Sequence, residues 1–331
     1  MGVKAKDLAK RMGISVSTVY KAFNGADDIN AETRAAVLET AAEMGYIGGT
    51  RHKASKRVCV FMGRMGAPHV TYYLYEVMLA FKQMAEGQGY EVVIRSLEDE
   101  SYAPFYRVIE QERFDGAIVL GLNDSSPFFD HLDEAACPIV LVDNYVEGKL
   151  ISCVTSDNLS GMGMVVSHLI QLGHRRIGFI NGEQQSFTSR ERFAGFLNAI
   201  TLGELTYDPE LVFNGDFSER SGEQGAELLL GKRVTALVCA SDLMAIGAIR
   251  RLKELGLQIP QDMSVTGFDD IRISTYISPT LTTVRINIKD VGFRAFMCLK
   301  NLIEYQNATR VVEMPRLMVR ESTAPPRAAQ D

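Results

Sequence analysis

Polar side chains stand directly after apolar, strand-like runs at three places in the chain. Asp143 follows PIVLV, Ser241 and Asp242 follow TALVCA, and Asp269 and Asp270 follow MSVTGF. In an open parallel α/β sheet, ligands bind beyond the carboxyl ends of the strands, because helix N-termini and loop side chains converge there. Carboxylates accept hydrogen bonds from vicinal hydroxyls, so these residues are candidates for contacts with a hydroxylated ligand.

Two of these aspartates also have simpler interpretations. Asp242 is placed to cap the helix LMAIGAIRRL that follows it, because an aspartate at that position accepts backbone N–H groups. Asp270 suits a turn.

The alternative function is a sugar-processing enzyme, such as a glycosidase that uses two of the cleft aspartates as acid and base. The sequence has no GxxxxGK[ST], GxSxG or HExxH motif that would support catalysis of the corresponding kinds.

The elements that must position these residues follow from the hydrophobic pattern. From Val58 onward, short apolar runs alternate with amphipathic helical segments, and the runs read VCVFM, EVVI, GAIVL, PIVLV, RIGFI, TALVCA and MSVTGF. This alternation predicts parallel sheets with crossover helices on both faces. There are more such units than one ordinary domain holds, so we expect more than one sheet.

Composition excludes several classes of protein. With 331 residues and a prior of about 150 residues per domain, the chain is expected to form two or three domains. It is 46% hydrophobic and 23% charged, as a soluble globular protein is. No apolar run approaches the roughly 18 to 20 residues that cross a bilayer, and the first residues lack a signal-peptide pattern. We therefore expect a cytoplasmic protein with no membrane partner.

The five cysteines are scattered through the chain, mostly inside apolar segments. They show no metal-ligand spacing, so we predict buried free thiols in a reducing compartment, with no metal and no cofactor.

Charge is divided unevenly along the chain. Residues 1–57 hold ten lysines and arginines against six aspartates and glutamates, a net charge of +4. The whole chain has a net charge of −6, so the remainder carries −10. A basic head on an acidic body indicates that the head meets a polyanion.

Three short helices are predicted in the basic head. The first covers about residues 4–11 and ends at Gly13, the second covers 16–23 with Ser15 as its cap, and the third starts near residue 31 after Asn30 and ends at Gly45. Helical spacing predicts that the inward-facing residues are Leu8, Ala9, Met12, Val19, Ala22, Phe23, Val37, Leu38, Ala41 and Met44.

The first two helices have the spacing that a steep crossing needs. Such a crossing requires a small residue where the backbones approach, a residue that tolerates positive φ in the turn, and an apolar anchor on the second helix. Ala9, Gly13 and Val19 supply these in order. The alternative is a three-helix bundle with no role in nucleic-acid binding, but the outward face of the second helix is polar and small.

The run VKAKDLAKRMGISVSTVYKAFNG, followed by INAETRAAVLETAAEMGY, resembles the helix-turn-helix domain of the lactose/galactose-repressor (LacI/GalR) family. Later segments, among them HLIQLGHRRIGFINGE, SRERFAGF and SPTLTTVRINIKDVG, resemble the core of the same family. The resemblance implies an N-terminal all-α helix-turn-helix domain and an α/β two-lobed core of the periplasmic-binding-protein type I fold. That core has parallel sheets and three crossovers, which we expect near 155–158, 284–288 and 315–320.

The resemblance also implies the domain boundaries. We expect a helix-turn-helix DNA-binding domain over 1–46, a basic hinge over 47–57, an N-terminal lobe over 58–156 and 288–315, and a C-terminal lobe over 157–287 and 316–331. The hinge, IGGTRHKASKR, departs from the family pattern because it has no leucine and contains Gly48 and Gly49. Paired glycines disfavour a preformed helix, whereas the cations of the segment favour an electrostatic tether along phosphates.

The second helix of the head is expected to lie in a DNA major groove with its N-terminal end toward the bases. By resemblance, Val16 and Ser17 hold the base-specifying positions, where the valine contacts a thymine methyl and the serine bonds to base edges. Lys21, one turn further on, reaches a guanine. The resemblance implies phosphate contacts for Ser15, Thr18, Tyr20, Asn24 and Thr33, and the hinge cations include Arg51 and Lys53. For Tyr20 the alternative is a ring that covers the helix edge.

The core residues implied to bind effector come from both lobes. By resemblance, Asp143, Arg192, Ser241 and Asp269 match positions that contact effector in sugar-responsive members, and Phe217 matches an aromatic that stacks on a sugar ring. Alternatives remain for two neighbouring groups. Arg190 is either a ligand contact or a surface partner of Glu191 or Glu219. Tyr72, Tyr73 and Tyr75 either line the cleft or pack as a helix face.

These observations together predict a sequence-specific DNA-binding transcriptional regulator. We expect a homodimer on a two-fold symmetric operator, since one small head contacts too few base pairs for specificity. The regulated genes are expected to serve carbohydrate utilisation, under repression controlled by a small sugar-like effector between the lobes.

Overall fold

The computed structural model describes residues 5–23, 29–44, 56–63, 72–97 and 102–327, which form two compact units, Met1–Ser55 and Lys56–Asp331. The first unit contains helices α1 (Ala5–Met12), α2 (Val16–Phe23) and α3 (Ala31–Met44), so the prediction of three helices is confirmed. Most of the hinge, with Arg51 and Lys53, and also Asn24, lie outside the described residues.

Local capping and one turn explain where the helices of the head begin and end. The Ser15 side-chain Oγ accepts the backbone N–H of Thr18 at 3.0 Å, and Asn30 Oδ1 accepts that of Thr33 at 2.6 Å. Gly13 has φ +66°, which a residue with a Cβ rarely adopts, and it makes the turn between α1 and α2.

The predicted apolar residues of the head lie in its core with one exception. Leu8, Ala9, Val19 and Val37 are among the buried residues of this core. Leu38 is 40% exposed, so the prediction that it faces inward is wrong. It lies one position after Val37, which turns its side chain by about 100° away from the buried face of the helix.

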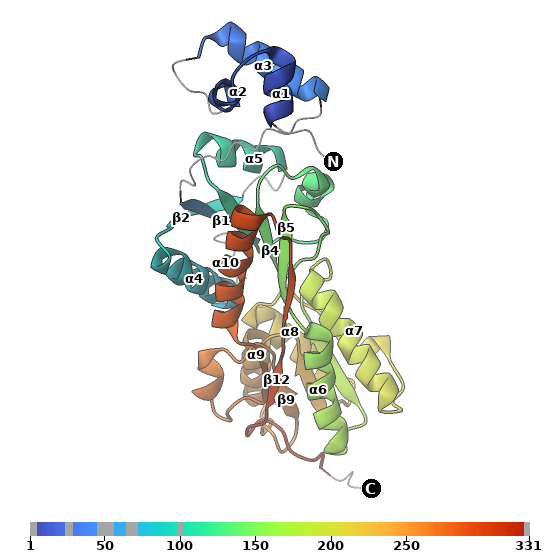
Figure 1. Cartoon of the computed structure of the whole chain (residues 1–331). Coiled ribbons are helices and arrows are strands. Elements are labelled where there is room, and N and C mark those ends of the chain that lie inside the picture. Colours follow the sequence, from blue (N-terminus) through green and yellow to red (C-terminus); the bar gives the residue numbers. More distant parts are fainter. Residues whose placement is uncertain (1–4, 24–28, 45–55, 64–71, 98–101, 328–331) are drawn as a thin grey trace. The chain divides into compact units, whose positions relative to one another are not determined.

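The N-terminal lobe of the second unit is built on a parallel six-stranded sheet with the order β11-β5-β4-β3-β1-β2 (Figure 1). Its strands are β1 (Arg57–Gly63), β2 (Glu91–Leu97), β3 (Gly116–Leu120), β4 (Ile139–Val142), β5 (Ile151–Ser156) and β11 (Arg310–Glu313). Its helices are α4 (Tyr72–Gly87), α5 (Tyr102–Gln111), the 3₁₀ segment η1 (Pro127–Glu134) and α10 (Ile288–Tyr305).

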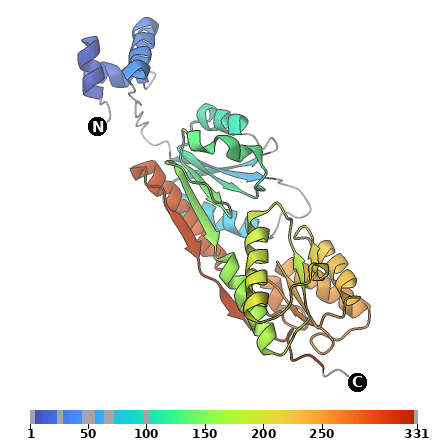
Figure 2. The same ribbon diagram turned by 90° about the vertical axis from the view of Figure 1, so that its right-hand side faces the viewer.

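Alternation along β1 shows how both faces of this sheet are covered. Val58, Val60 and Met62 belong to the core under α4 and α10, whereas Cys59 and Phe61 belong to the core under α5 and η1. Figures 1 and 2 show α4 and α10 side by side on one face of the sheet. The predicted helix cover on both faces is therefore confirmed for this lobe.

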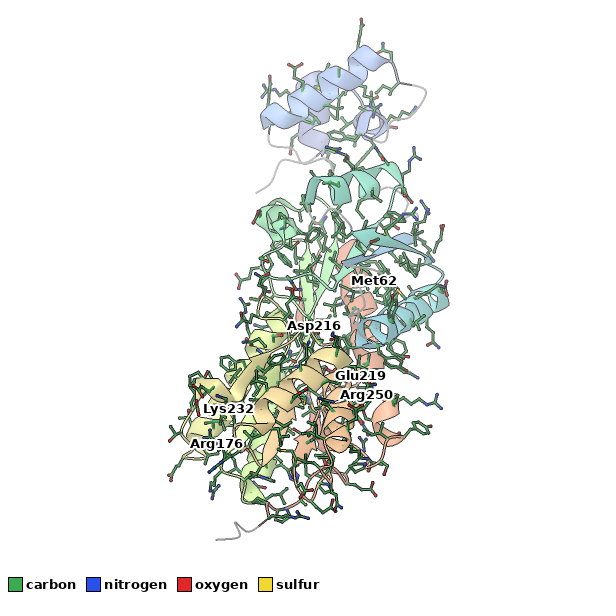
Figure 3. The ribbon with its side chains drawn as sticks, turned by 180° about the vertical axis from the view of Figure 1, so that it is seen from behind. Met62, Arg176, Asp216, Glu219, Lys232 and Arg250 are labelled. Atoms are coloured by element: carbon green, nitrogen blue, oxygen red, sulfur yellow. The ribbon has the colours of Figure 1, made fainter. Side chains whose placement is uncertain are left out.

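The C-terminal lobe has a parallel four-stranded sheet with the order β7-β6-β8-β9. Its strands are β6 (Ile177–Asn181), β7 (Val212–Asn214), β8 (Ala236–Cys239) and β9 (Ser264–Thr266). Its helices are α6 (Asn158–Gln171), α7 (Phe187–Leu202), η2 (Pro209–Leu211), α8 (Glu219–Leu230), α9 (Asp242–Glu254) and η3 (Arg272–Thr275). Helix α6 packs on α7, and α8 packs on α9, where Arg250 and Glu219 form an ion pair of 2.5 Å (Figure 3).

The chain crosses between the lobes three times, as predicted. It passes from β5 to α6, from β10 (Thr283–Arg285) to α10, and from β11 to β12 (Arg316–Met318). Strands β10 and β12 pair antiparallel with each other in a small sheet of their own. Asp270 braces this region, since its carboxylate accepts from Arg285 Nε and Arg320 Nη2, each at 2.6 Å.

The cysteines are buried free thiols, as predicted, and burial raises the pKa of Cys59 and Cys137 to about 12. Within the described ranges, no helix combines the length and the apolar character that a membrane span requires.

Candidate functional site

The exposed face of α2 carries the residues predicted to read DNA. Ser17, Tyr20 and Lys21 are exposed, and the Tyr20 side chain is 47% exposed. Val16 is half-buried and packs partly against the core of the head. The start of this helix therefore presents one small polar and one partly covered apolar side chain, a pair that can contact base edges and a thymine methyl.

The two other hydroxyls at the start of α2 serve the fold of the head as well. Ser15 Oγ lies 2.8 Å from Thr18 Oγ1 and also caps the helix. Thr33 is half-buried in the first turn of α3, where its backbone N–H is held by Asn30. The helix N-termini at these residues carry partial positive charge, which suits a phosphate.

A cavity of about 120 Å³ lies between the two lobes of the second unit. Four of the five predicted effector residues line it: Asp143, Arg192, Phe217 and Asp269. The first of these comes from the end of β4 in the N-terminal lobe, and the other three come from the C-terminal lobe. Further lining residues are Gly63, Tyr73, Leu74, Gly121, Leu122, Asn123, Val142, Asn144, Glu183, Ser186, Thr188 and Asp216.

Arg192 donates from three of its nitrogens at the cavity wall. Its Nη2 lies 3.0 Å from Asp269 Oδ1, its Nε donates to Asn158 Oδ1 at 2.8 Å, and its Nη1 donates to the backbone carbonyl of Ala240. The guanidinium carbon lies 3.7 Å from the centre of the Phe268 ring. These contacts fix the guanidinium in one orientation beside the cavity.

Burial dominates the electrostatics of the cavity carboxylates. It raises the pKa of Asp143 to about 6, and the positive charge of Arg192 offsets part of this effect. Burial likewise raises the pKa of Asp269 to about 6 against the opposing charge of Arg192. For Tyr73, burial and then the charge of Asp143 hold the pKa of the phenol well above its usual value, so the hydroxyl keeps its proton.

Tyr73 Oη and Asp143 Oδ1 are buried at the cavity and have no partner at normal hydrogen-bond distance among the described residues. The two side chains face each other, because a hydrogen bond between them lowers the pKa of Asp143 and raises that of Tyr73. A buried polar atom without a partner costs about 1–3 kcal/mol, so a native fold retains one where something else satisfies it. A ligand that donates a hydrogen bond would satisfy the carboxylate.

Three of the residues that line the cavity have a strained backbone. Asp143, Phe217 and Asp269 have φ of +55°, +66° and +106°, in the region that residues with a Cβ rarely adopt. Such residues cost about 1–3 kcal/mol each and cluster at functional sites. The ring of Phe217 lies against Gly182, where a Cβ would come within 2.1 Å of Phe217 Cζ, so the glycine makes room for the ring.

The loops at this cavity also join the two lobes directly. Asn123 Nδ2 donates to Glu183 Oε1 at 3.0 Å, and Asp124 N donates to the backbone carbonyl of Gln185 at 2.9 Å. Arg190 forms an ion pair of 2.8 Å with Asp124. The sequence alternatives for Arg190, a ligand contact or a pair with Glu191 or Glu219, are therefore replaced by a bond to the other lobe.

Ser241 and Asp242 have other tasks than those predicted. Ser241 is the N-cap of α9, and its Oγ accepts from Met244 N, so the cap assigned to Asp242 belongs to Ser241. Asp242 is fully buried and accepts from Ile271 N, Ser274 Oγ and Thr283 Oγ1. Neither residue lines the cavity.

Comparison with known proteins identifies the family. Residues 4–48 match the model of bacterial regulatory proteins of the lacI family, and residues 166–323 match that of the periplasmic binding protein-like domain. The HTH-type transcriptional repressor PurR of Pectobacterium carotovorum (strain PC1) is 30% identical over 328 residues, which cover 96% of each chain. The chain belongs to the LacI family. It is therefore a DNA-binding transcriptional regulator.

Other LacI-family members match over almost the whole chain. The HTH-type transcriptional regulator MalR of Streptomyces coelicolor is 31% identical over 98% of this chain and 97% of its own. The structure of a transcriptional regulator CelR–cellobiose complex is 28% identical, with a TM-score of 0.75 over 97% of this chain and 99% of that one. The lac repressor dimer bound to operator and the anti-inducer ONPF has a TM-score of 0.70 at 25% identity, over 98% and 100%.

Sequence reasoning missed several lining residues of this LacI-family cavity. Asn123, Asn144 and Glu183 are among them. Each comes soon after the carboxyl end of a strand, so the rule that selected Asp143 applied to them as well. For Tyr72, Tyr73 and Tyr75 the sequence left two alternatives open, a place in the cleft or a helix face. Tyr73 lines the cavity, whereas Tyr72 and Tyr75 are exposed.

Proposed function

We propose that this regulator responds to a small sugar-like effector and acts as a repressor of carbohydrate-utilisation genes. The observation that carries the proposal is the buried acceptor Asp143 Oδ1, which has no partner at normal hydrogen-bond distance among the described residues and lies in a cavity that also contains the Phe217 ring. Hydroxyl groups satisfy the first, and the C–H face of a sugar ring packs on the second.

We assign the effector contacts to Asp143, Arg192, Phe217 and Asp269, and omit Ser241 because its hydroxyl caps α9. Both lobes contribute to the cavity, so a bound ligand favours one orientation of the lobes over others. That orientation is the physical signal that reaches the head. Whether the effector weakens or strengthens DNA binding depends on which orientation it prefers.

For DNA we assign 1–46 as the reading domain and 47–57 as the basic hinge. Val16, Ser17 and Lys21 would contact bases. The residues assigned to phosphates are Ser15, Thr18, Tyr20, Asn24, Thr33, Arg51 and Lys53. The core would then divide into an N-terminal lobe of 58–156 and 288–315 and a C-terminal lobe of 157–287 and 316–331.

The regulator would act as a homodimer. Helix α4 and η3 line one groove. Leu79 of α4 is 52% exposed, Ile273 of η3 is 49% exposed, and Tyr276, which follows η3, is 70% exposed. Exposed large apolar side chains are typical of protein–protein interfaces. The lac repressor structure matched above is a dimer on operator DNA, which supports the same arrangement here.

The test is selection of genomic fragments by the purified full-length protein, followed by binding measurements with and without single sugars. We expect a two-fold symmetric site, an affinity that falls steeply with salt because phosphate contacts release counterions, and a change in affinity with one sugar. Indifference to every fragment at low ionic strength would refute the proposal. Consumption of the sugar would instead indicate the sugar-processing enzyme.

A further inference from the structure

We propose that two loops beside the cavity form a latch that holds the lobes together, and that the strength of this latch sets how often the lobes separate. The latch consists of residues 123–125 of the N-terminal lobe and residues 183–190 of the C-terminal lobe. The inference goes beyond the proposed function, because it concerns the motion of the lobes and does not depend on the chemistry of the effector.

Three consecutive residues of the N-terminal loop are bonded to the loop of the other lobe. Asn123 Nδ2 donates to Glu183 Oε1 at 3.0 Å, and Ser125 Oγ donates to Gln185 Oε1 at 3.3 Å. Between these two bonds, the backbone N–H of Asp124 donates to the backbone carbonyl of Gln185 at 2.9 Å. Atoms of the protein make all of these bonds, so the latch closes without a contribution from a ligand.

An ion pair adds a charged contact to the latch. Arg190 Nη2, near the start of α7, lies 2.8 Å from Asp124 Oδ2, and the two side chains are 59% and 22% exposed. Burial raises the pKa of Asp124, and the opposing charge of Arg190 lowers it. Neither residue is among those that line the cavity, so a change of either one leaves the cavity wall intact.

The latch lies at a distance from the segments that cross between the lobes. In the N-terminal lobe the chain crosses beside β5 and β11, and the latch loop follows β3, two strands away from β5. In the C-terminal lobe the other latch loop follows β6, two strands away from β9, which is bridged to the segment before β10. Two strand spacings are about 10 Å. Bonds at that distance oppose a rotation of the lobes about the crossovers, which act as the hinge.

Hydrogen exchange of the Asp124 amide measures the opening of the latch, because this N–H donates from one lobe to the other. Arg190→Gln removes the ion pair and leaves the backbone bond in place. We expect the Asp124 amide of the full-length variant to exchange about twofold to fivefold faster than in the wild type. The Asp143 amide donates to Val154 within one lobe and should keep its rate. An unchanged rate at Asp124 overturns the inference.

A matched control and a charge reversal show whether the effect belongs to this pair. Arg250 is 54% exposed, and its ion pair with Glu219 joins two helices of the same lobe (Figure 3). Arg250→Gln should therefore leave the exchange of the Asp124 amide unchanged. Arg190→Glu and Asp124→Lys should each speed this exchange, and the two together should restore it after correction for the intrinsic rate. Failure of the double variant to recover overturns the role of the pair.

The distance between the lobes shows whether the lobes part when the loops do. Spin labels on Arg107→Cys in α5 and Leu228→Cys in α8 report on the two lobes, since both positions are exposed and the native cysteines are buried. Excess unlabelled protein restricts the measured distances to one chain. The triple variant Ser125→Ala, Gln185→Ala and Arg190→Glu should lower the ratio of closed to open lobes by about thirtyfold. A distance distribution equal to that of the wild type overturns the inference.

Operator binding separates this inference from the proposed function. If the orientation of the lobes reaches the head, the triple variant should change operator affinity by about fivefold or more with no effector present. A longer distance between the lobes with unchanged operator affinity supports the latch and refutes the transmission of lobe orientation to the head. An unchanged distance overturns the latch at any operator affinity, and it leaves the proposed function in place.

Discussion

Gly182→Ala should weaken effector binding without unfolding the protein. The new Cβ would lie 2.1 Å from Phe217 Cζ, and ordinary contact begins at 3.4 Å, so the ring has to retreat by the difference of 1.3 Å. The nearest three atoms are Cζ, Cε1 and Cε2 of that ring, so the side chain and not the backbone has to move.

The size of the effect follows from what the ring does in the cavity. Loss of its packing on the ligand costs about 0.5–1.5 kcal/mol beyond area burial, and crowding of a well-packed site costs about 1–3 kcal/mol. Together they predict a loss of at least about 1.5 kcal/mol, which is about a tenfold weaker effector affinity. Calorimetric titration measures this directly, and the operator affinity without effector should stay at the wild-type value.

A matched glycine supplies the control. A Cβ at Gly163, within α6, meets nothing within 4 Å. Gly163→Ala should therefore keep the effector affinity and stabilise the helix by about 0.5–1 kcal/mol. If Gly182→Ala binds effector like the wild type, the Phe217 ring does not bound the effector site, and the assignment of this cavity fails.

Exchanging Val16 and Ser17 for other small residues should change which operator is preferred while the head stays folded, as binding selection and circular dichroism would show; equal loss on every sequence contradicts base reading. Arg192→Ala should abolish the effector response and lower the free energy of unfolding by about 3 kcal/mol, because it strands the buried Asp269 carboxylate; an unchanged ligand titration rejects this. Since the pKa of Asp143 and of Asp269 is raised to about 6, both are ionised acceptors above that pH and protonated below it. Effector affinity should therefore fall as the pH is lowered from 7.5 to 5, and a rise over that range refutes the acceptor role. The same raised pKa values make ionisation unfavourable in the folded state, so the two groups should reduce stability as the pH rises from about 4 to about 6.

Hydrophobic periodicity was sufficient to predict the elements whose apolar residues follow one clear pattern. The strands with unbroken apolar runs and the helices of the head were predicted at their places. Strand β5, with the sequence ISCVTS, was not, because serine and threonine interrupt it although all six residues are buried. Its place between β4 and β11 buries both faces, and that place depends on a crossover that returns from distant residues.

The candidate site was predictable where one rule applied and unpredictable where the backbone decided. Strand ends correctly brought Asp143 and Asp269 to one cavity. The cap was predicted at Asp242 but lies at Ser241, because α9 begins one residue earlier than expected. Sequence patterns locate helix ends only to within one or two residues. The left-handed backbone of Phe217 has no signature in its residue type, since only glycine announces such a conformation.

Asp269 and Asp270 are neighbours with separate attachments: the first holds Arg192 at the cavity, and the second holds Arg285 and Arg320 where the lobes exchange chain. Two adjacent residues thus connect the cavity wall to the segments that cross between the lobes. A substitution of Asp269 that changes ligand preference would therefore also disturb the contacts of Asp270 with Arg285 and Arg320. Relatives that evolve toward new effectors should therefore vary at more peripheral lining positions, such as Ser186 and Thr188, and keep Asp269 and Asp270.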